Sequence, residues 1–325
     1  MMKKLVFIVN LLLLVVTGII AQELDLPKLI GPYLGQEPPG ITPELFMPGI
    51  ISTEAPEGSS GFACNGTVFL FQRFIDAECH TFIMTRTDNI WSKPELIPFW
   101  RQLIHNGDFV IFPDDKTMFY QVKQQVADRL DSDIWSVTLD KGSFDRQCAL
   151  QAPINTPYNE SYASRSRKGN LYFFSQRPGG LGQSDLYMSE YKNGVYTDPI
   201  NLEILNTSFH EWDPYIAPDE SYIVFCSTKP GGKGMDDLYI SFKNKDNQWG
   251  EPITMGNMIN STGSENRPYV TNDSQFFFFT SSKRGNRDIY WVDAKIIEEL
   301  MPKELKYSNH NKSILSNHAP VHPGK

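Results

Sequence analysis

Short runs of apolar and aromatic residues recur along the chain, and turn-forming residues separate them. In one unit, which begins at Glu211, the run PYIA is followed by the turn PDES, the run YIVFCS, the loop KPGGKGMD and the run LYISFK. The turn KDNQ and the segment WGEPITMG come next. Short alternating runs between Pro, Gly, Asp and Asn predict β-strands joined by turns. The unit is therefore predicted to contain four antiparallel strands.

The same pattern occurs five times. Glu or Asn opens each unit, and the openings are 49 to 54 residues apart, at Glu57, Asn106, Glu160, Glu211 and Glu265. A regular period of this length indicates a repeat architecture, and four antiparallel strands per repeat are typical of a β-propeller blade. Separate hairpins are the alternative, but isolated hairpins could not bury these aromatic faces.

The two ends of the repeat region complement one another. The segment PELFMPGIISTEAPE near the N-terminus matches PITMGNMINSTGSE, which holds the fourth strand of a later unit. The last unit has three strands and then the helical pattern AKIIEELMPKELK. We predict an all-β propeller over residues 43–293, with five blades and an N-terminal strand completing the last one. Six blades is the alternative, because the Pro-rich segment 22–42 is hard to place. A short helix and a disordered tail are expected over residues 294–325.

The N-terminus has the pattern of an export signal. Lys3 and Lys4 precede a continuous apolar run, and Ala21 provides a small residue for cleavage. An uncleaved anchor is the alternative, because the run is only slightly shorter than a bilayer span. No cysteine lies near Ala21, so a lipid anchor is not expected. We predict a signal peptide over residues 1–21 and an exported protein, whether periplasmic, outer-surface or secreted, without stable membrane insertion after cleavage.

Composition and cysteine spacing narrow the chemistry. The chain has 325 residues and a net charge of −8, which argues against nucleic acid as the main partner. The four cysteines form no CxxC pattern, and Cys64 and Cys79 are predicted at opposite ends of one sheet, so free and mostly buried thiols are expected. HExxH, P-loop and calcium-loop patterns are absent from the sequence. We expect a monomer without cofactor, metal or catalytic residues.

The unit APDESYIVFCSTKPGGKGMDDLYIS resembles the WD-type propeller repeats of the TolB-like family, which are common in exported bacterial proteins. That family has Ser-Pro-Asp-Gly, an aromatic strand, Ser-x-Arg, a Gly-rich loop and Asp-Ile/Leu-Tyr. The match is close in the last three units. It is looser in the first two, where CNG and PDD stand in place of Pro-Asp-Gly and His80 replaces the Asp. The resemblance implies a propeller and leaves the biochemical role open.

Each unit carries a Glu or Asn at its opening, a cation after its second strand and an acid or His at its third strand. Antiparallel order places these groups at one face of the propeller. Because nearly every unit has them, we interpret them as structural: the Asp binds amides of its Gly-rich loop, while the Glu and the cation keep blades in register. A ring that binds a polar ligand or an ion is the alternative. The sets are Glu57/Arg73/His80, Asn106/Lys123/Asp133, Glu160/Arg177/Asp185, Glu211/Lys229/Asp237 and Glu265/Arg284/Asp288.

The glycines of the two most similar loops have a structural interpretation as well. The sequence PGGLGQS leads into a strand, whereas a phosphate cradle leads into a helix N-terminus. Gly179, Gly180, Gly231 and Gly232 are therefore expected at positive φ in a wide hairpin loop.

A binding site should differ from the repeat. Trp212 beside Glu211 and His210 is one such difference, with Arg177, Lys229 and Arg284 predicted on the same face, although blade packing is the alternative role for Trp212. In the second unit, the predicted loop VKQQVADRLDS is longer and lacks glycine. The prediction is an exported, non-enzymatic propeller that binds a protein or glycan of the cell envelope. The alternative is a hydrolase or lyase acting on polysaccharide at the pore mouth, where His80, His105 and His210 could meet.

Overall fold

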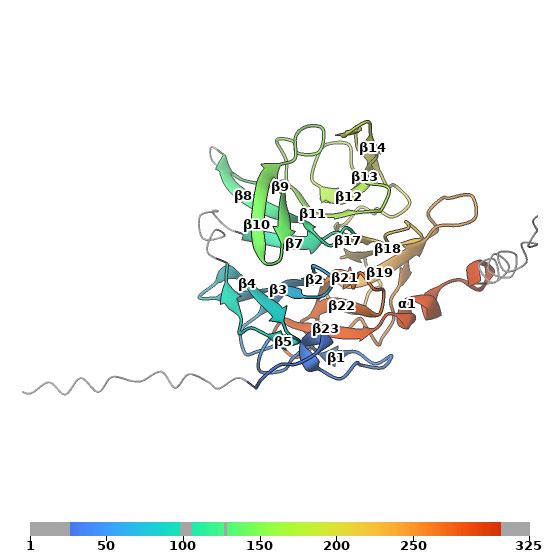
Figure 1. Cartoon of the computed structure of the whole chain (residues 1–325). Helices are drawn as coiled ribbons and strands as arrows, with labels where there is room; N and C mark the ends of the chain where they lie inside the picture. The colour runs from blue at the N-terminus through green and yellow to red at the C-terminus, as the bar shows by residue number, and fades with distance from the viewer. Residues whose placement is uncertain (1–26, 98–105, 127–128, 307–325) are drawn as a thin grey trace, which may run out of the picture.

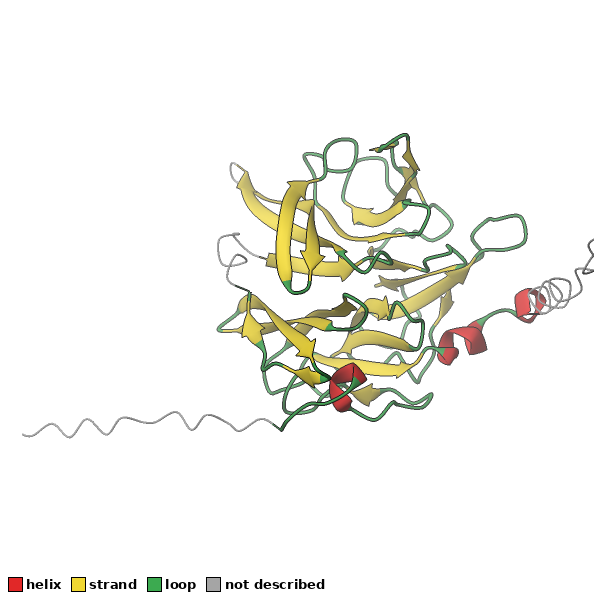
Figure 2. Ribbon diagram, in the orientation of Figure 1, coloured by secondary structure: helices red, strands yellow, loops and turns green. Residues whose placement is uncertain are grey.

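The chain folds into a five-bladed β-propeller, which Figures 1 and 2 show as small twisted sheets arranged around a centre. The computed structural model describes residues 27–97, 106–126 and 129–306. The predicted fold class is confirmed, with five blades and not six. The predicted signal peptide, His105 and the C-terminal tail lie outside the described residues.

Each blade is an antiparallel sheet, and in blades 1 to 4 its strands come from one continuous segment of the chain. Blade 1 contains β2 (Glu57–Ala63), β3 (Val68–Ile75), β4 (Glu78–Thr87), β5 (Ile90–Trp91) and β6 (Glu95–Leu96). Blade 2 contains β7 (Asn106–Ile111), β8 (Thr117–Val126), β9 (Arg129–Asp140) and β10 (Ser143–Ala149). Blade 3 contains β11 (Glu160–Arg165), β12 (Leu171–Ser175), β13 (Asp185–Ser189) and β16 (Ile200–Asn201), with the outer hairpin β14 (Tyr191–Lys192) and β15 (Val195–Tyr196). Blade 4 contains β17 (Glu211–Ile216), β18 (Tyr222–Ser227), β19 (Asp237–Phe242) and β20 (Ile253–Thr254).

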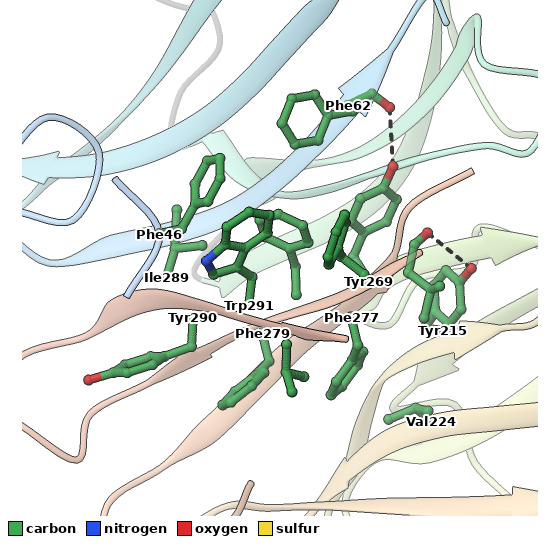
Figure 3. Packing of buried hydrophobic residues seen from close by; sticks show 14 of the residues in the cluster. Phe46, Phe62, Tyr215, Val224, Tyr269, Phe277, Phe279, Ile289, Tyr290 and Trp291 are labelled. Atoms are coloured by element: carbon green, nitrogen blue, oxygen red, sulfur yellow. Dashed lines mark hydrogen bonds between the residues drawn. The ribbon is translucent and has the colours of Figure 1, made fainter. Parts of the chain in front are cut away.

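Blade 5 joins the two ends of the chain. It contains β21 (Glu265–Val270), β22 (Phe276–Ser281), β23 (Asp288–Asp293) and the N-terminal strand β1 (Glu44–Leu45). Leu45 pairs with Tyr290. The ring of Phe46, which follows β1, lies 5.1 Å from that of Trp291 (Figure 3). The predicted closure by an N-terminal strand is therefore confirmed.

The segment before β1 crosses from blade 5 to blade 1. Gly31 donates its N–H to the Asn89 carbonyl oxygen at 3.0 Å, and its own carbonyl accepts the indole N–H of Trp91 at 2.7 Å. The 3-10 turn η1 (Pro32–Gly35) places the Tyr33 ring 4.7 Å from that of Phe276. After β23, helix α1 (Lys295–Leu300) follows. None of the helices in the described part is long and apolar enough to cross a membrane.

The core fills the seams between blades, because each sheet packs a face on each neighbour. All six residues of β22 are buried for this reason. Hydrogen bonds also cross the seams: Tyr215 donates its hydroxyl to the Val270 carbonyl oxygen, and Tyr269 donates to that of Phe62, each at 3.2 Å (Figure 3). Bulky aromatic side chains therefore determine both the spacing and the register of neighbouring blades.

Two sequence-based expectations need correction. The four cysteines are free as predicted, and Cys64 and Cys79 lie at opposite ends of blade 1, but only Cys226 is fully buried and Cys148 is exposed. The expected loop of the second unit is largely strand, since β8 and β9 extend the hairpin to Val126 and Arg129. Asp133 therefore lies within β9 and does not open it.

Candidate binding face and central channel

The propeller has two ends with different loops. At one end, here called the loop face, lie the loops between the second and third strands of each blade and the connections to the next blade. At the other, here called the turn face, lie the turns between the first and second strands. The predicted site residues are all at the loop face, because they stand at the matching ends of paired strands: Glu211 pairs with Ser227, which pairs with Asp237.

The glutamates that open the blades are buried and fully engaged. Glu211 accepts hydrogen bonds from the amide and hydroxyl of Thr207, at 2.8 and 2.7 Å, and from the Ser227 hydroxyl at 2.6 Å. The carboxylates of Glu57, Glu160 and Glu265 also bind a Thr or Ser four residues upstream. These carboxylates join the connection between two blades to the first strand of the next.

An asparagine that the sequence analysis did not single out completes this link. Asn206 accepts the Leu186 amide at 2.8 Å and donates to the Leu186 carbonyl at 3.0 Å, so it ties the connection to the previous blade. Asn155 and Asn260 bind Ile134 and Leu238 in the same way. The repeated pattern Asn-Thr/Ser-x-x-x-Glu is the signal that could have identified them.

The cations pack on the tyrosines of the Asp-Leu/Ile-Tyr motif. The Lys229 ammonium lies 4.0 Å from the Tyr239 ring centroid, and that of Lys283 lies 3.8 Å from Tyr290. Arg177 lies over Tyr187 and donates to the Ile154 carbonyl at 2.7 Å. Lys283, and not Arg284, is thus the equivalent cation of blade 5, which corrects the predicted set. Arg284 is exposed.

Asp185 and Asp237 bind the Gly-rich loops that precede them. Asp185 accepts the Gly182 amide at 2.9 Å, and Asp237 accepts the amides of Lys233 and Gly234 at 2.5 and 3.2 Å. In blade 5, Asp288 is buried and pairs with Ser281, and in blade 1 His80 pairs with Arg73 at the same position.

Glycine is required in these loops for three separate reasons: a positive φ, space for the Asp carboxylate and close contact with the connection to the next blade. Gly179 and Gly231 each have a φ of 92°, as expected. Gly180 and Gly232 do not have positive φ, which corrects the prediction; a Cβ on Gly232 would lie 1.9 Å from the Asp237 carboxylate. A Cβ on Gly182 would lie 1.9 Å from the Phe209 carbonyl oxygen, so this glycine permits contact with the connection to the next blade.

The third residues of the first strands converge at the centre and form what we call the channel cluster. Each lies at or beside a break in register, where the strand bulges. Arg267 donates to both oxygens of Asp108, at 2.6 and 3.2 Å, and its amide donates to Asp213 at 3.2 Å. The cluster consists of Ser59, Asp108, Tyr162, Asp213 and Arg267.

The channel cluster was not among the residues predicted from the sequence. The five repeats carry four different residue types at this position, two residues after the repeated Glu or Asn, and this variation is the signal that could have identified it. The pairing of Arg267 with Asp108 joins residues 159 positions apart, which no local pattern predicts.

The two carboxyl groups of the cluster have opposite electrostatic environments. Burial favours the neutral form of Asp108, but the Arg267 guanidinium, together with the charges of Lys123 and Arg287, outweighs burial and holds the pKa of Asp108 below its usual value. Burial, together with the charge of Asp108, raises the pKa of Asp213 to about 7. One carboxyl is thus ionised at neutral pH while the other titrates there.

His210 and Trp212 lie beside each other at the loop face of blade 4. Their ring centroids are 5.2 Å apart, and His210 Nδ1 is 3.2 Å from the Ser184 hydroxyl oxygen. Trp212 is half-buried and packs against the largest hydrophobic cluster. This contact favours blade packing, the alternative role considered for Trp212.

Four exposed apolar side chains stand on the loops and connections of blades 3 and 4 at the loop face, and we call this set the apolar arc: Tyr158, Leu181, Phe209 and Met235. Leu181 is 55% exposed, Phe209 41% and Met235 72%. Backbone contacts hold two of these loops against the following connection: Gln183 donates to the Phe209 carbonyl at 3.1 Å, and Met235 donates to that of Gly263 at 2.9 Å. The loops that carry Leu181 and Met235 are therefore each braced by the connection to the next blade.

The strand pairing defines this chain as a five-bladed β-propeller. No family model and no curated protein matches the sequence. Among solved structures, the chain is similar to TolB from Acinetobacter baumannii, with 14% identity and a TM-score of 0.45 over 74% of this chain and 55% of that one. It thus spans about half the length of that TolB structure.

Two further structures are similar at comparable levels. Endo-arabinase from Bacteroides thetaiotaomicron has 10% identity and a TM-score of 0.47, covering 79% of this chain and 97% of that one. Alpha-L-arabinofuranosidase from Lactobacillus brevis has 11% identity and a TM-score of 0.48, covering 75% and 91%.

Proposed function

We propose that this protein is an exported, non-enzymatic module that binds another protein of the cell envelope through the apolar arc on its loop face. Export is supported by the N-terminal sequence, in which a basic start, an apolar run and a small residue at Ala21 follow one another. The partner is expected to present apolar side chains together with acidic groups, because the exposed cations Lys233 and Arg284 stand on loops of the same face.

The exposure of the apolar arc is the observation that carries this proposal. In blades 3 and 4 the repeated Glu, Asn, cation and Asp side chains already have partners within the protein. They explain how the loops are held, but they do not explain why Leu181 and Met235 are exposed to water. Exposed apolar side chains gathered in one place mark interaction sites, and aromatic residues and Met are enriched in interface cores. Braced loops also reduce the entropy lost on binding.

The test compares two sets of exposed apolar residues by affinity capture from an envelope extract. The double variant Leu181→Ser with Met235→Ser removes the two most exposed side chains of the arc, whereas Val195→Ser removes a side chain that is 63% exposed on β15, away from the loop face. We expect Val195→Ser to capture the same protein as the parent, and the double variant to capture at least about ten-fold less. Equal capture by the double variant, or no captured protein from the parent, would refute the proposal.

A hydrolase acting on polysaccharide is the second candidate, and the channel cluster is the observation that favours it. Carboxyl groups with pKa values pushed in opposite directions are typical of acid–base pairs, as for Asp108 and Asp213. Against it, both oxygens of Asp108 are held by Arg267. Release of reducing ends from polysaccharide by the parent protein would favour this candidate over the binding module.

A further inference from the structure

We infer that the turn face contains a second, independent binding site, which takes a neutral sugar ring. A cavity of about 470 Å³ opens there, between the turns of blades 5, 1 and 2, and the η1 segment forms one wall. This volume lies within the range of about 300–1,000 Å³ that is usual for small-molecule sites. The apolar arc and the channel cluster belong to other parts of the molecule, so this inference does not depend on the proposed function.

The cavity lies where the repeat is broken. Blade 4 keeps the family-like turn Pro-Asp-Glu at Pro218, but the cavity is lined by Asn65 and Gly66 of blade 1, by Pro113 and Asp115 of blade 2, and by Asn272 and Asp273 of blade 5. The N-terminal segment adds Pro32 and Tyr33. A feature needed by every blade would be common to all of them, whereas this combination of turns exists at one place in the ring.

Aromatic side chains form the apolar part of the lining. The rings of Tyr33 and Phe62 meet edge to face with centroids 5.2 Å apart. The Tyr33 hydroxyl donates to the Asp273 carboxylate, which fixes the ring at the wall of the cavity. Such rings combine apolar surface with a polar edge, and this suits the C–H face of a sugar ring with hydroxyl groups at its rim.

Two carboxylates of the cavity lining, those of Asp115 and Asp273, are held in place by hydrogen bonds and can each accept a further one. Asp115 accepts the Asn272 side-chain amide at 2.8 Å and the backbone amide of Asn65. Asp273 accepts the Thr271 hydroxyl at 2.6 Å in addition to Tyr33. An ionised carboxylate has about four acceptor positions, so each can still accept a hydrogen bond from a ligand.

Arg86 supplies donors that are not used within the described part of the protein. Its side chain is half-buried, and its guanidinium lies 5.5 Å from the Trp91 ring centroid. Among the described residues this guanidinium forms neither a hydrogen bond nor an ion pair. Stacking on Trp91 therefore holds a rigid fork of N–H donors at the cavity wall, and no residue in the described ranges accepts from it.

The balance of these groups defines the class of ligand. An anion would be attracted to Arg86 but would meet Asp115 and Asp273, while a cation would meet Arg86. Hydroxyl groups both donate and accept, so a neutral polyhydroxylated ring can bind the carboxylates and the guanidinium at the same time. The aromatic lining adds the apolar contact that a sugar ring requires. A neutral saccharide of one or two rings fits all three features.

The test is calorimetric titration of the full exported chain with methyl glycosides of glucose, galactose, mannose and xylose, and with cellobiose. Arg86→Ala is the informative variant, because its guanidinium stabilises no described polar partner and its loss should leave the melting temperature close to that of the parent. We expect at least one saccharide to bind, and Arg86→Ala to weaken that binding about ten-fold or more. Arg146→Ala is the matched control, since Arg146 is an exposed arginine of blade 2.

Three outcomes would overturn the inference: no saccharide binds, Arg86→Ala binds as tightly as the parent, or glucuronate binds where the neutral sugars do not. The double variant Leu181→Ser with Met235→Ser should bind saccharide like the parent, because it alters the opposite face. Loss of partner capture with intact saccharide binding, or the reverse, therefore separates the failure of one proposal from the failure of the other.

Discussion

At the scale of single residues, the same repeat position acquires different chemistry in different blades. Asp108 and Asp213 both stand third in the first strand of their blades, and Arg267 contacts both. Asp108 accepts hydrogen bonds from the charged guanidinium of Arg267, whereas Asp213 accepts one from the uncharged backbone N–H of Arg267. The charged form is therefore favoured in one and opposed by burial in the other. Position in the repeat thus determines where a side chain points, and its neighbours determine its protonation.

This difference predicts a dependence of stability on pH. The pKa of an Asp carboxyl in an unfolded chain is about 3.9, whereas that of Asp213 is about 7 in the folded protein. Between these values the folded state holds a proton that the unfolded state has lost, so the free energy of unfolding falls as pH rises and levels off above about pH 7. Below the unfolded pKa, both states are protonated and the effect is absent.

The variant Asp213→Asn removes this titration while keeping an oxygen that can accept the Arg267 amide. We expect urea unfolding at pH 5 and pH 8 to show a smaller loss of stability in the variant than in the parent, by about 1 kcal/mol or more. Asp246→Asn, at an exposed turn of blade 4, is the control and should behave like the parent. An identical loss in Asp213→Asn and parent would contradict the assignment.

At the scale of structural elements, the Gly-rich loops are held by specific contacts despite their glycine content. Gly231 supplies a positive φ, Gly232 leaves room for the Asp237 carboxylate, and Gly234 lets the loop contact the Gly263 carbonyl of the next connection. Asp237 then binds the amides of Lys233 and Gly234. The loop is therefore held by its own Asp on one side and by the neighbouring blade on the other.

Asp237→Ala should destabilise the protein by about 1–3 kcal/mol, because it leaves loop amides without an acceptor. Thermal or urea unfolding measures the loss. Asp246→Ala is the matched control, since it removes the same charge from an exposed position of the same blade and is expected to change stability by no more than about 0.5 kcal/mol. If Asp237→Ala unfolds like this control, the carboxylate does not hold the loop, and a ligand-binding role becomes the better interpretation.

At the scale of the whole molecule, the ring is closed by strand exchange between the two ends of the described chain. β1 pairs with β23, Phe46 fills the seam beside Trp291, and the Ser52 hydroxyl donates to the Ile289 carbonyl at 3.1 Å. Ser52 thereby takes the place that Asn155, Asn206 and Asn260 occupy in other connections. Without this segment, blade 5 would have an unpaired edge and the seam to blade 1 would lose its aromatic filling.

Deletion of residues 43–53 should therefore abolish cooperative unfolding or cause aggregation. Differential scanning calorimetry and size-exclusion chromatography of the deletion variant test this directly. Addition of a peptide with the sequence of residues 43–53 provides the control, because a strand supplied separately should restore part of the lost stability if pairing is the cause. A deletion variant that melts like the parent would show that the ring does not need β1.

The sequence determined the repeat, its strands and the closing strand, and it favoured five blades over six. Each of these follows from local information: the alternation of apolar residues, the turn residues between runs, and a constant period. The match between the N-terminal segment and the fourth strand of a later unit was enough to predict ring closure, because an open array would leave two unpaired edges. The roles of Glu211 and Asp237 were also accessible, since antiparallel pairing fixes which strand ends meet.

Only the tertiary structure decided which differences between repeats come together. Asp108, Asp213 and Arg267 meet because ring closure directs the same position of every blade to one axis, and their pKa values follow from burial and from neighbours far away in the chain. The cavity beside Arg86 likewise requires the turns of blades 5, 1 and 2 to be adjacent around the ring, with the N-terminal segment across them. The constant spacing of the repeats shows that the blades are alike. Only the closure of the ring determines which of the residues that differ between blades come together in one site.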